Sequence, residues 1–260
     1  KYNTRNLIKA IKHPSLLSAE FHRGVKSIRR RWEKFKFERE YGHGTNIMSK
    51  DWDYLIILDA CRYDIFKQVS EDVFWIEEEP ESIISKGSHS EEFASVNFSG
   101  TFYDTVYVTA NAYGARVGRE TFHDLIYSGE GKDEIKSRLH TFSDRMSPET
   151  IYDLTSSSVK KYPNKRIIAH FMQPHTPYLG DRAEELRERV KRDGLIVHWP
   201  QEEDDKMPIG KENLVPSLKQ AADRGYISKS ELQEVYAENL ENVLEYIGDL
   251  IEDLDGKVVI

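Results

Sequence analysis

Polar side chains that can bind a metal or an anion follow three apolar stretches of this chain. Asp59 ends the run "DYLIILD", Asn111 follows "VYVTA", and His175 follows "RIIAHFMQP". A carboxylate binds a cation, whereas an amide or an imidazole can contact an anion such as a phosphate ester. Such apolar runs are typical of strands buried in a parallel sheet, and ligands bind beyond the carboxyl ends of these strands. We therefore expect the three side chains to meet at one edge of a sheet.

A candidate nucleophile lies in the segment "KGSHSEEF". Ser88 precedes Glu91 by three residues, the spacing of a serine that caps a helix. The N–H groups at a helix start also stabilise an anion, so a phosphoryl group bound there would lie against the Ser88 hydroxyl. A nearby metal would lower the pKa of that hydroxyl and neutralise the ester oxygens. Ser90 is the competing candidate, and His89 on the same turn would touch the substrate.

The residues around the first strand end also have structural interpretations. Asp59 can cap the helix expected to start near Tyr63. Arg62 and Asp64 would bind the anion and the metal respectively, or would form an ion pair at the surface. Cys61 is expected to be a small packed residue rather than a nucleophile, because buried cysteines are usually inert.

Strands and helices alternate along the part of the chain that must position these residues. Strands are expected in the runs 53–64, 104–113 and 166–178 and in the final "KVVI". Helices are expected from Ile65, at 148–161, 181–193 and 228–253, and "VFWIEEE" is expected to lead into a further element. This alternation predicts an α/β fold with a mainly parallel, doubly wound sheet and helices on both faces. Residues 197–216 are expected to form a long loop or insertion.

Composition limits the class of protein. The 260 residues are 38% hydrophobic and 32% charged, which fits a soluble α/β domain with an appendage. One cysteine excludes an internal disulfide framework and a cysteine-based zinc site. No stretch approaches the roughly 20 apolar residues of a membrane span, and no signal-peptide segment opens the chain. A cytoplasmic setting fits these features.

Charge is divided unevenly between the two ends. Residues 1–43 carry twelve Lys and Arg against four Glu, which gives this part a net charge of +8. The whole chain has a net charge of −8, so residues 44–260 have a net charge of −16. Residues 15–41 place apolar side chains three and four apart beside a run of arginines, a pattern that suits an interfacial helix on anionic lipid at the membrane face. The alternative is a helix whose apolar stripe packs on the body, and nucleic acid is disfavoured because the acidic body repels phosphates. We interpret 1–49 as a basic amphipathic helical arm and 50–260 as the α/β domain.

Five segments, in this order and spacing, resemble the sulfatase-like branch of the alkaline phosphatase superfamily, and more narrowly its archaeal and bacterial sulfatase-like hydrolase/transferase proteins. They are "LIILDACRYDIF", "SKGSHSEEF", "VYVTANAY", "HFMQPHTPYLG" and "VYAENLENVLEYIGDLIEDLDGKVVI". The resemblance covers about residues 50–260 and implies an alkaline-phosphatase-like fold. It also implies a divalent metal (zinc, manganese or calcium) bound by Asp59, a nucleophile at Ser88 or Ser90, and contact of His175 with the substrate anion.

Two departures from the family pattern shape the expected function. Cys61, Ser88 and Ser90 all lack the C/S-x-P/A-x-R context of formylglycine sulfatases, so phosphate esters are favoured over sulfate esters. The family's remaining metal ligands, an Asp-His pair followed by Gly, come after the strand that "GKVVI" opens, so we expect a fragment without half of its metal site. The prediction is a metal-dependent hydrolase or transferase that acts through a serine on phosphate esters, with lipid-linked or glycan substrates as candidates. The alternative is a non-catalytic module that binds a glycan or a lipid headgroup.

Overall fold

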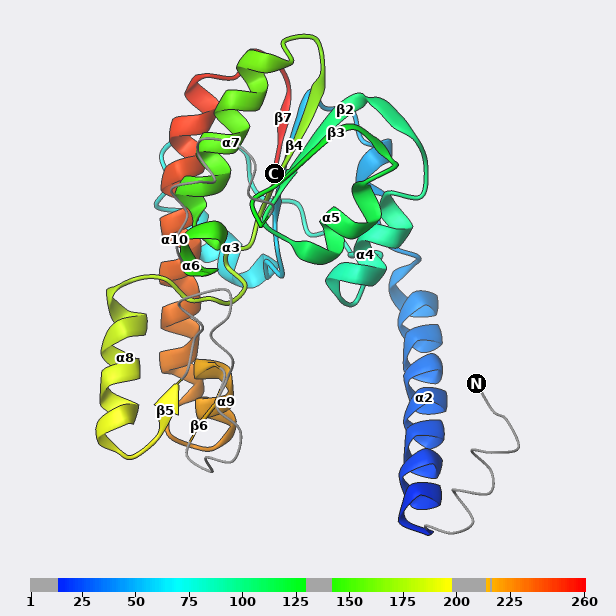
Figure 1. Cartoon of the computed structure of the whole chain (residues 1–260), viewed down its shortest axis with the longest axis vertical. Coiled ribbons are helices and arrows are strands. Elements are labelled where there is room, and N and C mark those ends of the chain that lie inside the picture. The colour runs from blue at the N-terminus through cyan, green and yellow to red at the C-terminus, as the bar shows by residue number, and fades with distance from the viewer. Residues whose placement is uncertain (1–13, 130–141, 198–213, 216) are drawn as a thin grey trace. The chain divides into compact units, whose positions relative to one another are not determined.

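A computed structural model describes residues 14–129, 142–197, 214–215 and 217–260 of the chain (Figure 1). The chain divides into two compact units. The first unit spans residues 1–45 and 83–86, and the second spans residues 46–82 and 87–260. Among the described residues, no helix combines the length and the apolar composition that crossing a membrane requires.

Helix α2 (Pro14–Tyr41) is the main element of the first unit. Proline suits a first helical turn, because its ring fixes φ and its missing N–H would have no partner there. The helix ends where Gly42 adopts a φ of +88°, a conformation that glycine tolerates best, and the Gly42 N–H donates to the Glu38 carbonyl over 2.9 Å. The helix predicted over residues 15–41 is confirmed.

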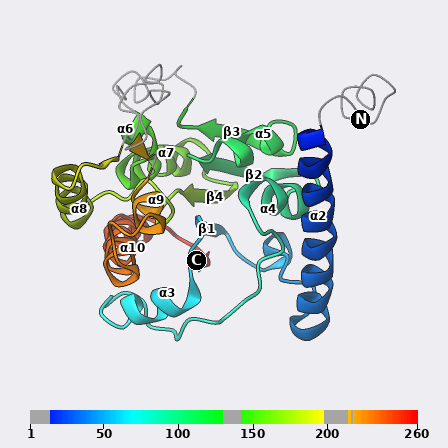
Figure 2. The same ribbon diagram turned by 90° about the horizontal axis from the view of Figure 1, so that it is seen from below.

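Five parallel strands form the sheet of the second unit, in the order β3-β2-β4-β1-β7 (Figures 1 and 2). They are β1 (Tyr54–Leu58), β2 (Phe102–Thr109), β3 (Phe122–Tyr127), β4 (Arg166–Phe171) and β7 (Val258–Val259). The register pairs Leu58 with Phe171 and Thr109 with His170. The carboxyl ends of β1, β4 and β2 therefore lie side by side at one edge. The predicted α/β fold with a parallel sheet is confirmed.

Helices cover both faces of this sheet (Figures 1 and 2). One face carries α3 (Tyr63–Ser70), α6 (Phe142–Met146), α7 (Pro148–Lys161) and α10 (Lys229–Glu252), and the other carries α4 (Ser90–Asn97) and α5 (Ala112–Gly118). Successive side chains of a strand point to opposite faces, so Val106 and Val108 pack with α7 and α10 while Tyr107 packs with α4. The apolar runs that predicted the strands are thus buried from both sides.

A smaller apolar core surrounds the first half of α10. It is built by α8 (Asp181–Arg192), α9 (Leu218–Asp223) and Val197 of β5 (Ile196–Val197). Strand β5 pairs in parallel with β6 (Leu214–Val215). The helix predicted over 228–253 is confirmed, and a capping box starts it, since Ser228 and Glu231 exchange both of its hydrogen bonds. The segment predicted as a loop over 197–216 contributes to β5 and β6 at its ends, and residues 198–213 and 216 lie outside the described residues.

Two parts of the second unit differ from the prediction. The segment "VFWIEEE" is not part of a helix or strand, and no regular element follows it before residue 83. Val73, Trp75 and Ile76 pack against the core from this irregular segment, so apolar residues there do not signal a regular element. Helix α5, the short helix η1 (Ile47–Ser49) and the edge strand β3 were not predicted. In β3, His123 and Asp124 interrupt the apolar pattern because most of this edge strand is only half-buried.

Candidate functional site

Asp59 lies directly after β1, where backbone contacts fix its position. Its N–H donates to the Phe171 carbonyl and its own carbonyl accepts from the His175 N–H, both over 3.1 Å. The next residue, Ala60, has a φ of +56°, which is rare outside glycine, and its carbonyl accepts from the Tyr236 hydroxyl over 2.8 Å. A strained residue persists only where its surroundings hold it, and such residues cluster at functional sites.

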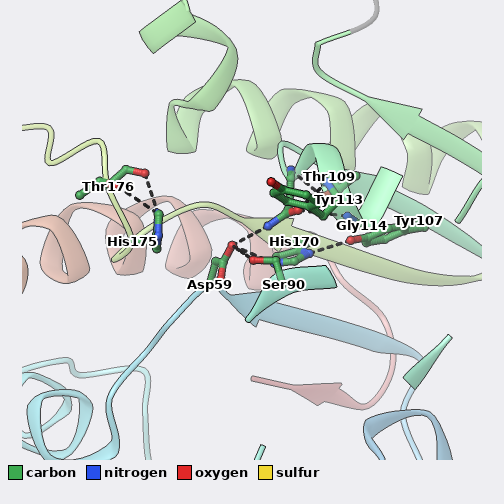
Figure 3. A network of polar contacts seen from close by, with 10 residues as sticks. Asp59, Ser90, Tyr107, Thr109, Tyr113, Gly114, His170, His175 and Thr176 are labelled. Carbon is green, nitrogen blue, oxygen red and sulfur yellow. Dashed lines mark hydrogen bonds and ion pairs between the residues drawn. The ribbon is translucent and has the colours of Figure 1, made fainter. Parts of the chain in front are cut away.

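Two side chains from neighbouring elements donate to the Asp59 carboxylate. Ser90 Oγ donates to Asp59 Oδ2 over 3.2 Å (Figure 3). Asn111 Nδ2 donates to the same oxygen over 2.6 Å. Asn111 also begins α5, because its Oδ1 accepts from the N–H groups of Tyr113 and Gly114. This cap fixes which end of the amide faces Asp59. The site therefore joins the ends of β1 and β2 to the start of α4.

Ser90, rather than Ser88, lies against Asp59. Helix α4 begins at Ser90, and its N-cap is His89, whose Nδ1 accepts from the Glu92 N–H over 3.3 Å. The exposed Ser88 donates through its N–H and its Oγ to Glu92 Oε2, over 3.0 and 2.8 Å. The predicted cap formed by Ser88 and Glu91 is therefore wrong, because the helix starts one residue later than that spacing suggested. Of the two candidate nucleophiles, Ser90 has the geometry of a site residue.

Two buried side chains, Tyr107 and His170, extend the network of polar contacts at the Asp59 carboxylate (Figure 3). His170 Nδ1 is 2.7 Å from the Tyr107 hydroxyl, and His170 Nε2 is 4.0 Å from Asp59 Oδ2. Burial lowers the pKa of His170 although the Asp59 charge opposes this, and burial raises the pKa of Tyr107. Both side chains are therefore neutral near pH 7. If Tyr107 donates to Nδ1, the single imidazole proton lies on Nε2 and faces the carboxylate, which is the electrostatically favourable arrangement.

Helix α5 makes room for this tyrosine. A methyl group at Gly114 would collide with the Tyr107 hydroxyl, and one at Gly118 would crowd its ring. The ring also packs against Phe122, with centroids 5.1 Å apart. The glycines of α5 therefore allow the hydroxyl to reach His170.

In Tyr107→Phe, His170 Nδ1 loses its hydrogen-bond donor, so we expect the imidazole proton to be shared between Nδ1 and Nε2 instead of staying on Nε2. We also expect the free energy of unfolding to fall by about 1–3 kcal/mol, because a buried nitrogen is left without its donor. Long-range ¹H–¹⁵N spectra should show the Nε2–H tautomer in the wild type and a mixture in the variant. Phe122→Leu is the matched control, since it loosens the packing around Tyr107 and keeps the hydroxyl. An unchanged tautomer in Tyr107→Phe would show that this hydrogen bond does not select it.

The other predicted residues lie in exposed or packed positions. Arg62 and Asp64 pair with each other over 2.6 Å, and this pair lowers the pKa of Asp64. The structure thus gives them the arrangement of a surface ion pair. Arg62 begins α3 without a side-chain cap, so the interpretation of Asp59 as the cap of that helix is wrong. Burial raises the pKa of the Cys61 thiol to about 12, which leaves it protonated and a poor nucleophile.

His175 contributes its backbone rather than its ring to the Asp59 contacts. Its Nδ1 lies 2.8 Å from the Thr176 carbonyl, and the ring lies apart from Asp59 and Ser90 (Figure 3). Asn239 of α10, which is fully buried, holds this turn. Its Nδ2 lies 3.2 Å from three carbonyls of the turn, and its Oδ1 accepts from the Leu179 N–H; the carbonyls are those of Pro174, His175 and Pro177.

Asp59 can serve as one ligand of the divalent metal that the resemblance implies. It is a carboxylate at the carboxyl edge of the sheet, and its side chain is 13% exposed. Within the described ranges, however, no three His, Cys, Asp or Glu side chains lie together so that they could hold a metal ion. Zinc takes about three protein ligands and calcium takes more. The described residues therefore do not make up a complete metal site.

Comparisons of the chain with models of protein families, with curated proteins and with solved structures found no match.

Proposed function

We propose that this protein hydrolyses or transfers phosphate esters, with Ser90 as the nucleophile and an alkaline-phosphatase-like form of the parallel α/β fold. The observation that carries the proposal is the contact between Ser90 Oγ and Asp59 Oδ2 at the start of α4. It combines a hydroxyl, an acid at a strand end and a helix N-terminus, which together suit attack on an anionic ester.

The helix start supplies the binding part of the mechanism. The first N–H groups of a helix lack partners within it and favour an anion. The Glu92 N–H already donates to His89, so phosphoryl oxygens would bind the N–H groups of Ser90 and Glu91 at the start of α4. The Ser90 hydrogen points to Asp59, which leaves the lone pairs of Oγ for the phosphorus. In-line attack forms the Oγ–P bond and breaks the ester P–O bond, while the Ser90 hydroxyl proton passes by way of Asp59 to the leaving alcohol. Water or a second alcohol then takes the phosphoryl group from Ser90.

The negative charge of Asp59 means that the proposed reaction requires a cation. A phosphate ester beside Ser90 would bring its negative charge close to that of the Asp59 carboxylate, and like charges repel strongly in a partly buried site. A divalent ion bound by Asp59, with zinc, manganese and calcium as candidates, would offset this repulsion and activate the hydroxyl. Sulfate esters remain the less favoured substrates, because Ser90 lies in "SEEFA" rather than in a formylglycine context.

Trapping the covalent intermediate tests this proposal. We expect acid-quenched samples of the intact protein, incubated with Mn²⁺ or Zn²⁺ and p-nitrophenyl phosphate, to contain a peptide phosphorylated on Ser90. Mass spectrometry of the digested protein locates the group. Ser90→Ala should abolish the label, and Ser88→Ala, which changes the neighbouring exposed serine, should keep it.

Two outcomes would contradict the proposal. A phosphoryl group on Ser88 would move the nucleophile by two residues. Absence of the label and of turnover, together with tight binding of a phosphorylated glycan or lipid headgroup, would favour the non-catalytic binding module instead.

A further inference from the structure

Helix α2 presents a row of exposed apolar side chains. Val25, Ile28, Trp32 and Phe35 are spaced by three and four residues, so they lie on one side of the helix. They are 50%, 70%, 57% and 56% exposed, respectively. Single apolar residues on a surface are ordinary, but a continuous row of this size marks an interaction surface.

Basic residues flank this row. The helical period places Arg29 and Lys36 along one side of it and Arg31 along the other. Lys36 Nζ lies 5.2 Å from the centre of the Trp32 ring. From Val25 to Tyr41, seven Lys and Arg stand against three Glu, a net charge of +4. An apolar face with tryptophan and basic margins fits the headgroup region of an anionic bilayer.

A second copy of the chain fits this surface poorly. If Val25, Ile28, Trp32 and Phe35 were the core positions of a coiled coil, the flanking e and g positions would be Arg29, Arg31, Lys36 and Glu38. Three of these four are basic, so two paired helices would bring like charges together. The next core position is Arg39, and burying a charge there without a partner is costly.

Nucleic acid also explains the surface less well than lipid does. Phosphates of DNA or RNA would pair with the basic margins, but they would leave Val25 and Ile28 without an apolar environment. Residues 44–260 carry a net −16 and would repel a nucleic acid. A lipid surface instead offers anionic headgroups and apolar chains in the same layer.

We propose that α2 docks this protein on an anionic lipid surface. Trp32 and Phe35 insert at the level of the headgroups, and Arg29, Arg31 and Lys36 contact lipid phosphates. This inference does not depend on the proposed catalytic function. It implies a peripheral position at a membrane face, where a substrate linked to lipid would be within reach of the protein.

Co-sedimentation with vesicles tests the docking. We expect the intact protein to bind vesicles of phosphatidylglycerol and phosphatidylcholine at least about tenfold more tightly than vesicles of phosphatidylcholine alone, with binding that weakens as salt rises. Trp32→Ser with Phe35→Ser should weaken the binding at least about tenfold, because the inserted apolar area is lost. Phe74→Ser is the matched control, since Phe74 is a 90% exposed aromatic residue of the second unit and should not matter.

A second variant separates charge from apolar insertion. Arg29→Gln with Arg31→Gln and Lys36→Gln keeps the apolar row and should reduce both the preference for anionic vesicles and its salt dependence. Circular dichroism establishes that α2 remains helical in both variants.

Three results would overturn the proposal. The first is equal binding to neutral and anionic vesicles, or binding that survives the Trp32 and Phe35 substitutions. The second is binding of duplex RNA that is as tight as vesicle binding and independent of Trp32. The third is that the protein does not bind vesicles and instead forms a dimer in sedimentation velocity, which the apolar substitutions abolish.

Discussion

Ser90→Ala is expected to lower the turnover of phosphate esters by the intact protein by at least about a hundredfold, the scale of losing a covalent step. Ser90 Oγ lies 3.2 Å from Asp59 Oδ2 at the start of α4, so the substitution removes the attacking oxygen. Alanine is a good helix former, so the first turn should persist. The loss should appear in kcat rather than in KM, because Ser90 acts on the bound ester.

Ser88→Ala is the matched control for this experiment. Ser88 is exposed and its hydroxyl donates to Glu92, so its removal should change the rate by less than about threefold, the effect of a weak surface hydrogen bond. Steady-state rates with p-nitrophenyl phosphate and its bis ester compare the two variants, and Ser90→Thr should recover part of the activity. If Ser88→Ala is inactive and Ser90→Ala is active, the assignment reverses. If neither changes the rate, covalent serine chemistry is wrong.

The central strands were predictable because a strand buried on both faces consists of nearly continuous apolar residues. β1 and β4 read as nearly continuous apolar runs, and parallel pairing follows from the helices between them. The edge strand β3 gave no such signal, since its half-buried positions tolerate His123 and Asp124. The order of the strands in the sheet could not be predicted from the pattern of apolar residues either. The structure inserts β4 between β1 and β2, and this brings His170 between Asp59 and Tyr107.

Part of the site was predictable for the same reason. Asp59 and Asn111 each follow a predicted strand, and parallel strands end at one edge. The choice between Ser88 and Ser90 could not be predicted. The spacing of Ser88 and Glu91 matches a capping box, but the Ser88 hydroxyl donates to Glu92, one residue further on. His89 provides the cap instead, and nothing in the spacing marks a histidine for that role. Tyr107 is paired with Ile168 in the sheet, and its hydroxyl reaches His170 two residues further along β4. This contact depends on the strand register, which continuous apolar runs buried on both faces do not determine.

Asp59→Asn is expected to lower phosphate ester turnover by at least about a thousandfold while leaving the fold intact. An asparagine can turn its oxygen toward Asn111 Nδ2 and Ser90 Oγ and keep both hydrogen bonds, so the substitution removes the charge alone. Without that charge the site cannot hold the cation that would offset the phosphate, and losing several kcal/mol of such stabilisation corresponds to this factor. Asp64→Asn is the matched control, since Asp64 pairs with exposed Arg62 and should change the rate by less than about twofold, as surface pairs contribute little.

Calorimetric titration of the 260-residue chain with Zn²⁺ or Mn²⁺ gives an independent readout of the same carboxylate. We expect weak binding, with a Kd no tighter than about a millimolar, because among the described residues Asp59 does not belong to any group of three or more Asp, Glu, His or Cys side chains that could hold a metal ion. Asp59→Asn should remove the residual heat and Asp64→Asn should retain it. Tight binding that Asp59→Asn abolishes would mean that residues outside the described ranges complete the site. Tight binding that survives Asp59→Asn would place the metal elsewhere and separate Asp59 from the chemistry proposed for Ser90.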